Sequence, residues 1–305
     1  MLIARIIYNK LSCLEKMTLL KSYYQLCKPN VVYMMLICAF VGMLLAEETV
    51  RSFGYLFVAL SGIALCSASA AAINQVIDRN TDASMTRTDQ RPLPKGELSA
   101  THASVFAFVI GVIGALILYF YVNTLTMILT IASLIGYAFI YTIYLKRATP
   151  QNIVIGGLAG AAPPLLGWSS ITNNIDPYAL LLVLIIFVWT PPHFWALAIY
   201  RKDEYARESI PMLPVTHGIV FTKLQIVLYT IILFIVSLLP YVVLMSGPIY
   251  LYSALILSSM FLYSSVKLYY SNDDEDAMKT FQFSIYYIFL IFLALLVDHF
   301  IILSQ

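Results

Sequence analysis

Residues 74–96 read NQVIDRNTDASMTRTDQRPLPKG, and this stretch concentrates charge between two long apolar runs at residues 63–73 and 105–121. Only 11% of the chain is charged. A charged segment that interrupts apolar runs of helical length is typical of the connection between two membrane helices, and it is the place to look for polar chemistry.

Three oxygen-bearing side chains in this stretch have helical spacing. Asn74, Asp78 and Asp82 follow one another at i, i+4 and i+8, so a helix would align them on one face. Such a stripe suits Mg²⁺, which is typically held by one or two carboxylates, waters and substrate phosphates. Arg87 and Arg91 follow with forked donors for phosphate oxygens. A solvated loop is the alternative, but the regular spacing favours a site for a metal and a phosphate.

The composition assigns the chain to the membrane. Of its 305 residues, 61% are hydrophobic, and the mean hydropathy is +0.84, which excludes an ordinary soluble domain. We predict an all-α polytopic membrane protein in which a polar N-terminal segment (1–28) precedes one transmembrane domain (29–305). Nine apolar segments near the roughly 20 residues of a spanning helix are expected at 30–46, 54–77, 102–122, 124–145, 152–171, 178–199, 221–246, 248–270 and 281–303.

This series of segments has two weak points, one between the third and fourth segments and one within the fifth. The third and fourth are separated only by Asn123 and Thr124. The fifth contains Pro163-Pro164, and consecutive prolines in a membrane helix predict a kink whose freed backbone groups need other partners.

The basic residues predict an orientation. With nine spans, 17 of the 18 lysines and arginines fall on the side of the N-terminus, and only Arg51 falls on the other. Positive charge marks the cytoplasmic side. We therefore expect the N-terminus and the charged loops near residues 78–98, 146–151 and 200–217 on that side, where several loops could build one site. The short N-terminus favours a bacterial inner membrane, and no nucleic-acid partner is expected.

The other two loops carry further candidates. Lys146 and Arg147 follow an aromatic run that includes Tyr141. They either bind phosphate beside the carboxylates or form an interfacial aromatic belt with a basic anchor. Asp203 and Glu204 are a second acidic group, which is either a solvated loop or the second half of a two-metal clamp on a diphosphate.

His193 lies within an apolar span, directly after Pro192. A titratable group there is costly and usually functional, which makes His193 a candidate for substrate binding. The alternative is a neutral imidazole that hydrogen-bonds to backbone groups left open by the prolines.

These features together describe a substrate with a phosphorylated head and a lipid tail. Metal ions would neutralise a leaving diphosphate, and a dry cavity would shelter the carbon chain. Alkyl transfer from a prenyl diphosphate is the reaction expected, and phospholipid-headgroup transfer is a neighbouring alternative, although its D-G-x-x-A-R opening is absent from this sequence.

The motif N-Q-x-x-D-R-x-x-D at residues 74–82, followed by M-x-R-T-x-x-R-P-L-P-x-G at 85–96, resembles the first aspartate motif of the UbiA-type intramembrane prenyltransferases. PPHFWALA at 191–198 and IPMLP at 210–214 resemble, within that superfamily, the protohaem IX farnesyltransferases, or haem O synthases. The likeness runs in consistent order over about residues 22–220.

The resemblance implies a nine-helix bundle around a lipid-accessible cavity, with farnesyl diphosphate as donor and protohaem IX (haem B) as acceptor. It implies that Asn74, Asp78, Asp82 and Asp203 hold Mg²⁺. It further implies phosphate binding by four basic side chains, Arg87, Arg91, Lys146 and Arg147. The downstream haem A synthase is a further partner that it suggests.

One departure concerns the second aspartate motif, which is usually D-x-x-x-D, because Arg207 stands four residues after Asp203. Arg207 would then grip a diphosphate oxygen or a haem propionate. A UbiA-type enzyme with another aromatic acceptor, such as a quinone precursor, and a non-catalytic carrier of lipid or haem are the alternatives. A carrier would not need Asn74, Asp78 and Asp82 in helical register.

Overall fold

The computed structural model describes residues 18–46 and 51–303, and all regular secondary structure in these two ranges is helical. Thr18–Leu26 is helical, and it precedes α2 (Pro29–Leu45), α3 (Phe53–Ser84), α4 (Ala100–Tyr121), α5 (Thr124–Ile135), the π-helix η1 (Gly136–Leu145), α6 (Lys146–Ala148), α7 (Asn152–Ala161), α8 (Pro163–Thr172), α9 (Pro177–Tyr200), α10 (Lys202–Arg207), α11 (Leu213–Thr216), α12 (Gly218–Val242), α13 (Pro248–Tyr270) and α14 (Asp274–Leu303).

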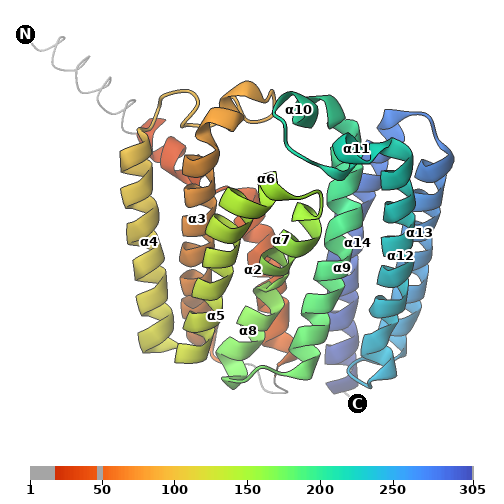
Figure 1. The fold of residues 1–305 in the computed structure, drawn as a ribbon. Coiled ribbons are helices and arrows are strands. Elements are labelled where there is room, and N and C mark those ends of the chain that lie inside the picture. Colours follow the sequence, from red (N-terminus) through yellow and green to blue (C-terminus); the bar gives the residue numbers. More distant parts are fainter. Residues whose placement is uncertain (1–17, 47–50, 304–305) are drawn as a thin grey trace, which may run out of the picture.

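The long helices form a bundle with their axes roughly aligned (Figure 1). Within the described ranges, eight helical segments are long and apolar enough to cross a membrane, and a ninth results if Thr18–Leu26 and α2, bent by 49°, count as one span. The predicted all-α polytopic membrane protein is confirmed. Much of the predicted segment 1–28 lies outside the described residues, and the lipid-accessible cavity remains a prediction.

Two helices extend beyond the apolar runs that predicted them, α3 at its end and α14 at its start. α3 continues to Ser84 instead of ending near residue 77, because Asp78, Thr81 and Asp82 on its last turns are buried and have polar partners. α14 begins at Asp274 instead of residue 281, since three acidic residues in its first turn interact favourably with the helix dipole.

Both predicted weak points are real breaks. α4 ends at Tyr121, and the side chain of Asn123 accepts a hydrogen bond from the Thr126 backbone N–H, which caps α5. The fifth span divides into α7 and α8 at Pro163, where a proline in the first helical turn needs no hydrogen-bond acceptor for its nitrogen.

The fourth span contains a feature that the sequence did not predict. After α5 the chain winds as a π-helix for the ten residues of η1 before α6 begins at Lys146. The hydroxyl of Thr142 donates to the carbonyl of Tyr137, five residues earlier, at 2.8 Å. Long π-helical stretches are rare and often occur at functional sites.

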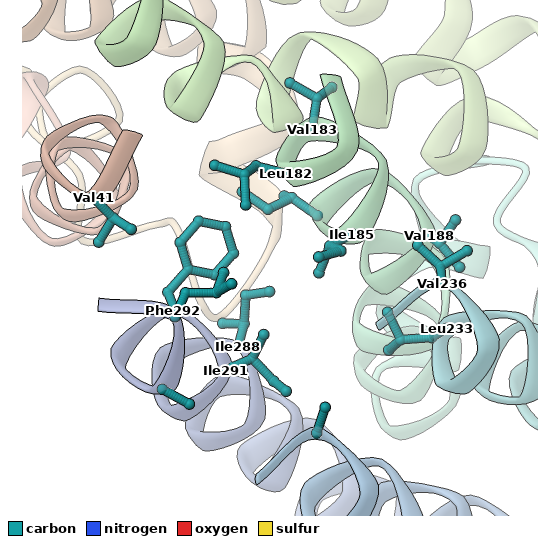
Figure 2. Close-up of a cluster of buried hydrophobic side chains, with 14 of the residues drawn as sticks. Val41, Leu182, Val183, Ile185, Val188, Leu233, Val236, Ile288, Ile291 and Phe292 are labelled. Carbon is teal, nitrogen blue, oxygen red and sulfur yellow. The ribbon is translucent and has the colours of Figure 1, made fainter. Parts of the chain in front are cut away.

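Apolar side chains of α2, α9, α12 and α14 interdigitate in the core of the bundle (Figure 2). Leu182 and Ile185 of α9, Leu233 of α12 and Ile291 of α14 belong to this one cluster, and all four are at most 1% exposed. Because lipid is as apolar as these residues, close packing is the main force that holds such helices together.

Glycines allow α2 and α8 to approach each other closely. A side chain added at Gly167 of α8 would overlap the backbone carbonyl of Ala39 in α2. A side chain added at Gly42 of α2 would likewise overlap the carbonyl of Pro164 in α8. Small residues of this kind are typical of membrane helix interfaces.

The charged connections lie at one end of the bundle. Figure 1 shows the connection from α3 to α4, α6, α10 and α11 together at the upper end, and the α8–α9 and α12–α13 connections at the lower end. Figure 1 shows the start of α3 at the lower end, and Arg51 precedes that start by two residues in the sequence. The charged loops therefore share one end of the bundle, as expected, and the side of the membrane that this end faces stays a prediction.

Candidate active site

The last turns of α3 present a stripe of buried oxygen ligands. Asn74 is 4% exposed, Asp78 is 3% exposed and Asp82 is 4% exposed. All three lie in one continuous helix, so the predicted i, i+4, i+8 register is present. Burying two carboxylates is costly unless cations and hydrogen bonds compensate them, and this requirement explains the contacts around the stripe.

The buried negative charge of Asp78 is compensated by a residue from another span. The ammonium of Lys146, at the start of α6, lies 2.8 Å from Oδ2 of Asp78. The same carboxylate oxygen accepts a hydrogen bond of 3.0 Å from Nδ2 of Asn74. The structure thus brings Lys146 to the carboxylates, and phosphate binding by Lys146 stays a prediction.

The buried negative charge of Asp82 is compensated by the loop that follows α3. A guanidinium nitrogen of Arg91 is in direct contact with Oδ2 of Asp82. The hydroxyl of Thr88 donates to the backbone carbonyl of Asp82 at 3.0 Å. These contacts fold the loop back over the end of α3, which places Arg91 beside the stripe, whereas Arg87 is exposed.

The π-helix η1 faces the stripe. Oγ1 of Thr142 accepts a hydrogen bond of 3.0 Å from Nδ2 of Asn74. Tyr141 stacks on Tyr137 with ring centroids 5.8 Å apart, and it fills space that a side chain at Gly156 would occupy. η1 therefore orients the carboxamide of Asn74 and leads directly into Lys146.

Arg147 also reaches α3. Its guanidinium donates to Oγ1 of Thr81 at 3.0 Å, and the residue is exposed. Thr81 directly precedes Asp82 and follows Asp78 by about one helical turn, so this contact brings Arg147 to the end of α3 that carries the stripe.

The second acidic group is less closely connected to the stripe. Glu204 pairs with Arg201 at 2.9 Å, whereas Asp203 and Arg207 are exposed on α10. Among residues 18–46 and 51–303, no three histidine, cysteine or acidic side chains form a cluster that could hold a metal. The role predicted for Asp203 at a second metal stays a prediction.

Tyr205 of α10 lies close enough to Arg87, in the loop after α3, to feel its charge. Burial raises the pKa of Tyr205, and the nearby guanidinium groups of Arg87 and Arg201 oppose that rise. Met85, directly after α3, belongs to the same apolar cluster as Met212 of the IPMLP stretch. The two charged loops are therefore neighbours.

His193 lies in the core between α9 and α14. Its ring stacks between Trp189, at 4.3 Å, and Phe281, at 4.5 Å, and Nδ1 lies 2.6 Å from the hydroxyl of Ser284. The imidazole therefore contacts a side chain of α14 and not the backbone groups freed by the prolines.

The sequence analysis missed four residues that contact the stripe or support it. They are Lys28, Gln75, Thr81 and Thr142. Lys28 donates to Oδ1 of Asn74. Thr81 lies on the motif helix between the two aspartates. The contacts of Lys28 and Thr142 come from segments distant in sequence, so no local pattern revealed them.

The donor set fits a magnesium ion. Two carboxylates and a carboxamide oxygen are hard ligands, and substrate phosphates and waters usually complete the shell of Mg²⁺. Each ligand is held by a different cation: Asn74 by Lys28, Asp78 by Lys146 and Asp82 by Arg91. Lys146 and Arg91 neutralise the two carboxylates, and Lys28 adds one further positive charge at the stripe.

The chain belongs to the UbiA prenyltransferase family, whose model matches residues 35–296. It is 59% identical over 280 residues to protoheme IX farnesyltransferase 2 of Pseudoalteromonas atlantica, and the match covers 92% of each chain. It is 58% identical over 280 residues to protoheme IX farnesyltransferase of Legionella pneumophila, covering 92% of this chain and 95% of that one. These relatives place it in the protoheme IX farnesyltransferase branch.

Solved structures share the fold. A digeranylgeranylglyceryl phosphate synthase matches with a TM-score of 0.77 at 19% identity, covering 92% of this chain and 98% of that chain. A UbiA homolog from Archaeoglobus fulgidus, bound to GPP and Mg²⁺, matches with a TM-score of 0.61 at 15% identity, covering 90% of this chain and 99% of that chain.

Proposed function

We propose that this chain transfers the farnesyl group of farnesyl diphosphate to a vinyl group of haem B, which gives haem O and diphosphate. The structural observation that carries the proposal is the buried Asn74–Asp78–Asp82 stripe, on which each oxygen ligand is matched by a cation from a different segment. The relatives named as protoheme IX farnesyltransferases support the choice of acceptor.

Asp78, Asp82 and Asn74 would hold Mg²⁺, and Asp203 would contribute to a second ion. When bound, Mg²⁺ neutralises the negative charge that develops on the leaving diphosphate. The Mg²⁺-bound homolog from Archaeoglobus fulgidus supports a divalent metal in this fold.

The basic side chains around the stripe would bind the diphosphate. Lys146 and Arg91 already lie against the carboxylates, and Arg147 is held beside them by Thr81. Arg87 is exposed in the same loop and free to fold inward over a substrate. Charge-assisted hydrogen bonds from these groups strengthen as charge accumulates on the leaving oxygen, so they lower the barrier to its departure.

In the reaction, the bond between C1 of the farnesyl group and the diphosphate oxygen breaks, and the vinyl carbon of the haem supplies the electron pair for the new carbon–carbon bond. Water then adds to the neighbouring vinyl carbon and loses a proton, which leaves a hydroxyethylfarnesyl side chain. The apolar surroundings of the stripe keep other water molecules from the allylic carbon before the acceptor reaches it.

Three residues are proposed for substrate contacts beyond the stripe. Tyr141 lies on η1 next to the stripe, and Arg207 on α10 offers a guanidinium to a haem propionate or a diphosphate oxygen. His193 is proposed for the acceptor, since it is a polar side chain held rigidly within an aromatic stack inside the bundle. A rigid aromatic wall of this kind suits a flat macrocycle.

The charged end of the bundle is proposed to face the cytoplasm of a bacterial inner membrane, because basic residues gather there. The haem O released is a lipid-soluble product that an oxidising enzyme, the downstream haem A synthase, would take up.

An acceptor competition tests the assignment. Purified protein would receive radiolabelled farnesyl diphosphate, Mg²⁺ and equal amounts of haem B and 4-hydroxybenzoate, a quinone precursor. We expect label in the haem fraction alone. Label in the benzoate would assign the chain to a quinone pathway, and release of no diphosphate with either acceptor would favour a carrier.

A further inference from the structure

Lys28 joins the N-terminal helix to the stripe. It follows the helix Thr18–Leu26, directly precedes Pro29 at the start of α2, and donates to Oδ1 of Asn74. Its positive charge is in excess of the charges that the two carboxylates of the stripe neutralise. Lys146 and Arg91 each pair with a carboxylate, whereas the partner of Lys28 is a neutral carboxamide. Hydrogen bonds between two charged groups are stronger, so Lys28 is the cation most easily drawn to an anion.

The backbone of Lys28 is held in an unusual conformation. Its φ is 49° and its ψ is 60°, the left-handed region that a non-glycine residue rarely adopts. Its carbonyl accepts from Val31 N at 2.9 Å and so starts α2. Strained residues persist only where their surroundings fix them, and they gather at functional sites.

Gln75 holds the backbone of Lys28 in this left-handed conformation. Its Nε2 donates to the backbone carbonyls of Gln25 at 3.1 Å and Leu26 at 3.0 Å, which end the helix before Lys28. Gln75 is 1% exposed, and its two neighbours only accept hydrogen bonds, which fixes the orientation of its amide. Asn74 and Gln75 are adjacent in α3, so the first contacts the ammonium of Lys28 while the second holds the backbone that presents it.

The N-terminal helix is docked at two further points. The hydroxyl of Ser22 donates to the carboxylate of Glu97 at 2.6 Å. Leu26 is fully buried in an apolar cluster with Ala72 of α3 and Ala103 of α4. This docking makes the position of Lys28 a fixed property of the fold and not the result of one flexible side chain.

We propose that Lys28 binds the diphosphate of the prenyl donor and that Gln75 is the residue that positions it. The inference rests on the proposed function, because it assigns the surplus charge to the diphosphate that Asp78 and Asp82 would hold through Mg²⁺. On binding, the ammonium of Lys28 leaves Asn74, whose oxygen becomes available to the metal, and takes a phosphate oxygen.

The test is a titration of the purified full chain with inorganic diphosphate and Mg²⁺, followed by calorimetry, which requires no turnover. Lys28→Met should weaken binding about tenfold to a hundredfold, the scale of one charge-assisted contact. Lys28→Arg should stay within about threefold of the parent, because it keeps the charge. Lys21→Met is the matched control: it removes an exposed lysine from the same N-terminal helix and should change nothing.

Lys28→Gln covers the case in which Lys28→Met does not fold. Glutamine can still donate to Asn74 but carries no charge, so this variant should fold and still lose diphosphate affinity. If it binds Mg²⁺ and diphosphate as well as the parent, Lys28 is not a diphosphate ligand and the inference is overturned.

A double-mutant cycle separates positioning from general stabilisation. Gln75→Met should weaken diphosphate binding in the parent but not in a Lys28→Gln background, because it acts through Lys28. An equal effect in both backgrounds would overturn the positioning role. A parent that binds no diphosphate with Mg²⁺ would instead contradict the proposed function. A parent that binds it, with Lys28 variants that bind equally, would contradict this inference alone.

Discussion

The ammonium of Lys146 lies 2.8 Å from Oδ2 of Asp78, and this contact joins two segments that are 68 residues apart. It closes the candidate site because it brings the end of the fourth span to the end of the second. Both side chains are largely buried, at 16% and 5% exposed, so each depends on the other to compensate its buried charge.

The first prediction concerns Asp78. Asp78→Asn keeps the size of the side chain and its contacts with Asn74 and Lys146 but loses the charge that would bind Mg²⁺. Turnover should fall at least about a hundredfold, with farnesyl transfer to haem as the assay. Asp274→Asn, the same change at an exposed position at the start of α14, should leave the rate unchanged. Full activity of Asp78→Asn at limiting Mg²⁺ would remove the stripe from the mechanism.

Arg91 is expected to act on the donor and not on the haem. Arg91→Lys replaces a fork that can take two oxygens with a single ammonium, so one charge-assisted contact is lost, worth about 1.5–3 kcal/mol. The kcat/KM for farnesyl diphosphate should drop about tenfold to a hundredfold. Haem affinity, measured by spectral titration without donor, should stay the same, and Lys95→Met in the same loop should affect neither value. Lost haem binding with normal donor binding would assign this loop to the acceptor.

Much of this account was predictable from the sequence because its signals are local. The apolar runs marked the spans, Asn123 and Pro163-Pro164 marked two breaks, and the spacing of Asn74, Asp78 and Asp82 predicted their shared face. All of these depend on residues within a few turns of one another.

The features that the sequence did not predict depend on tertiary contacts. The continuation of α3 to Ser84 is stabilised by partners such as Lys146 and Arg91 that lie outside it. The π-helical winding of η1 and the approach of Lys28 to Asn74 have no local pattern, since both arise where separate helices meet. Asp203 is exposed on α10, and the role at a second metal predicted from its motif position stays a prediction.

The topology is testable with single cysteines in a background without Cys13, Cys27, Cys38 and Cys66. Ser84 and Ser209 are exposed at the charged end, so cysteines there should react with an impermeant thiol reagent only from the cytoplasmic side. Asn174, exposed between α8 and α9, should react only from the opposite side. Labelling of position 84 or 209 from outside would contradict the nine-span arrangement.

A stability prediction concerns the contact between α2 and α8. Gly167→Ala would force a methyl group into the backbone of α2 at Ala39, and overpacking of this kind costs about 1–3 kcal/mol or more. The Tm in detergent should fall clearly. Gly160→Ala is the matched control in α7, because a side chain there meets open space, and its Tm should be unchanged or slightly higher. Equal Tm values for the two variants would show that α2 and α8 are not in close contact.

The central claim is the transfer of a farnesyl group to haem at the stripe on α3. The most direct measurement is the mass of haem extracted after purified protein has been incubated with haem B, farnesyl diphosphate and Mg²⁺. The account predicts a haem heavier by one farnesyl group and one hydroxyl group, formed by the parent and absent when Mg²⁺ is chelated or when Asp78 is replaced by Asn. Unmodified haem from a folded parent protein in the presence of Mg²⁺ would contradict it.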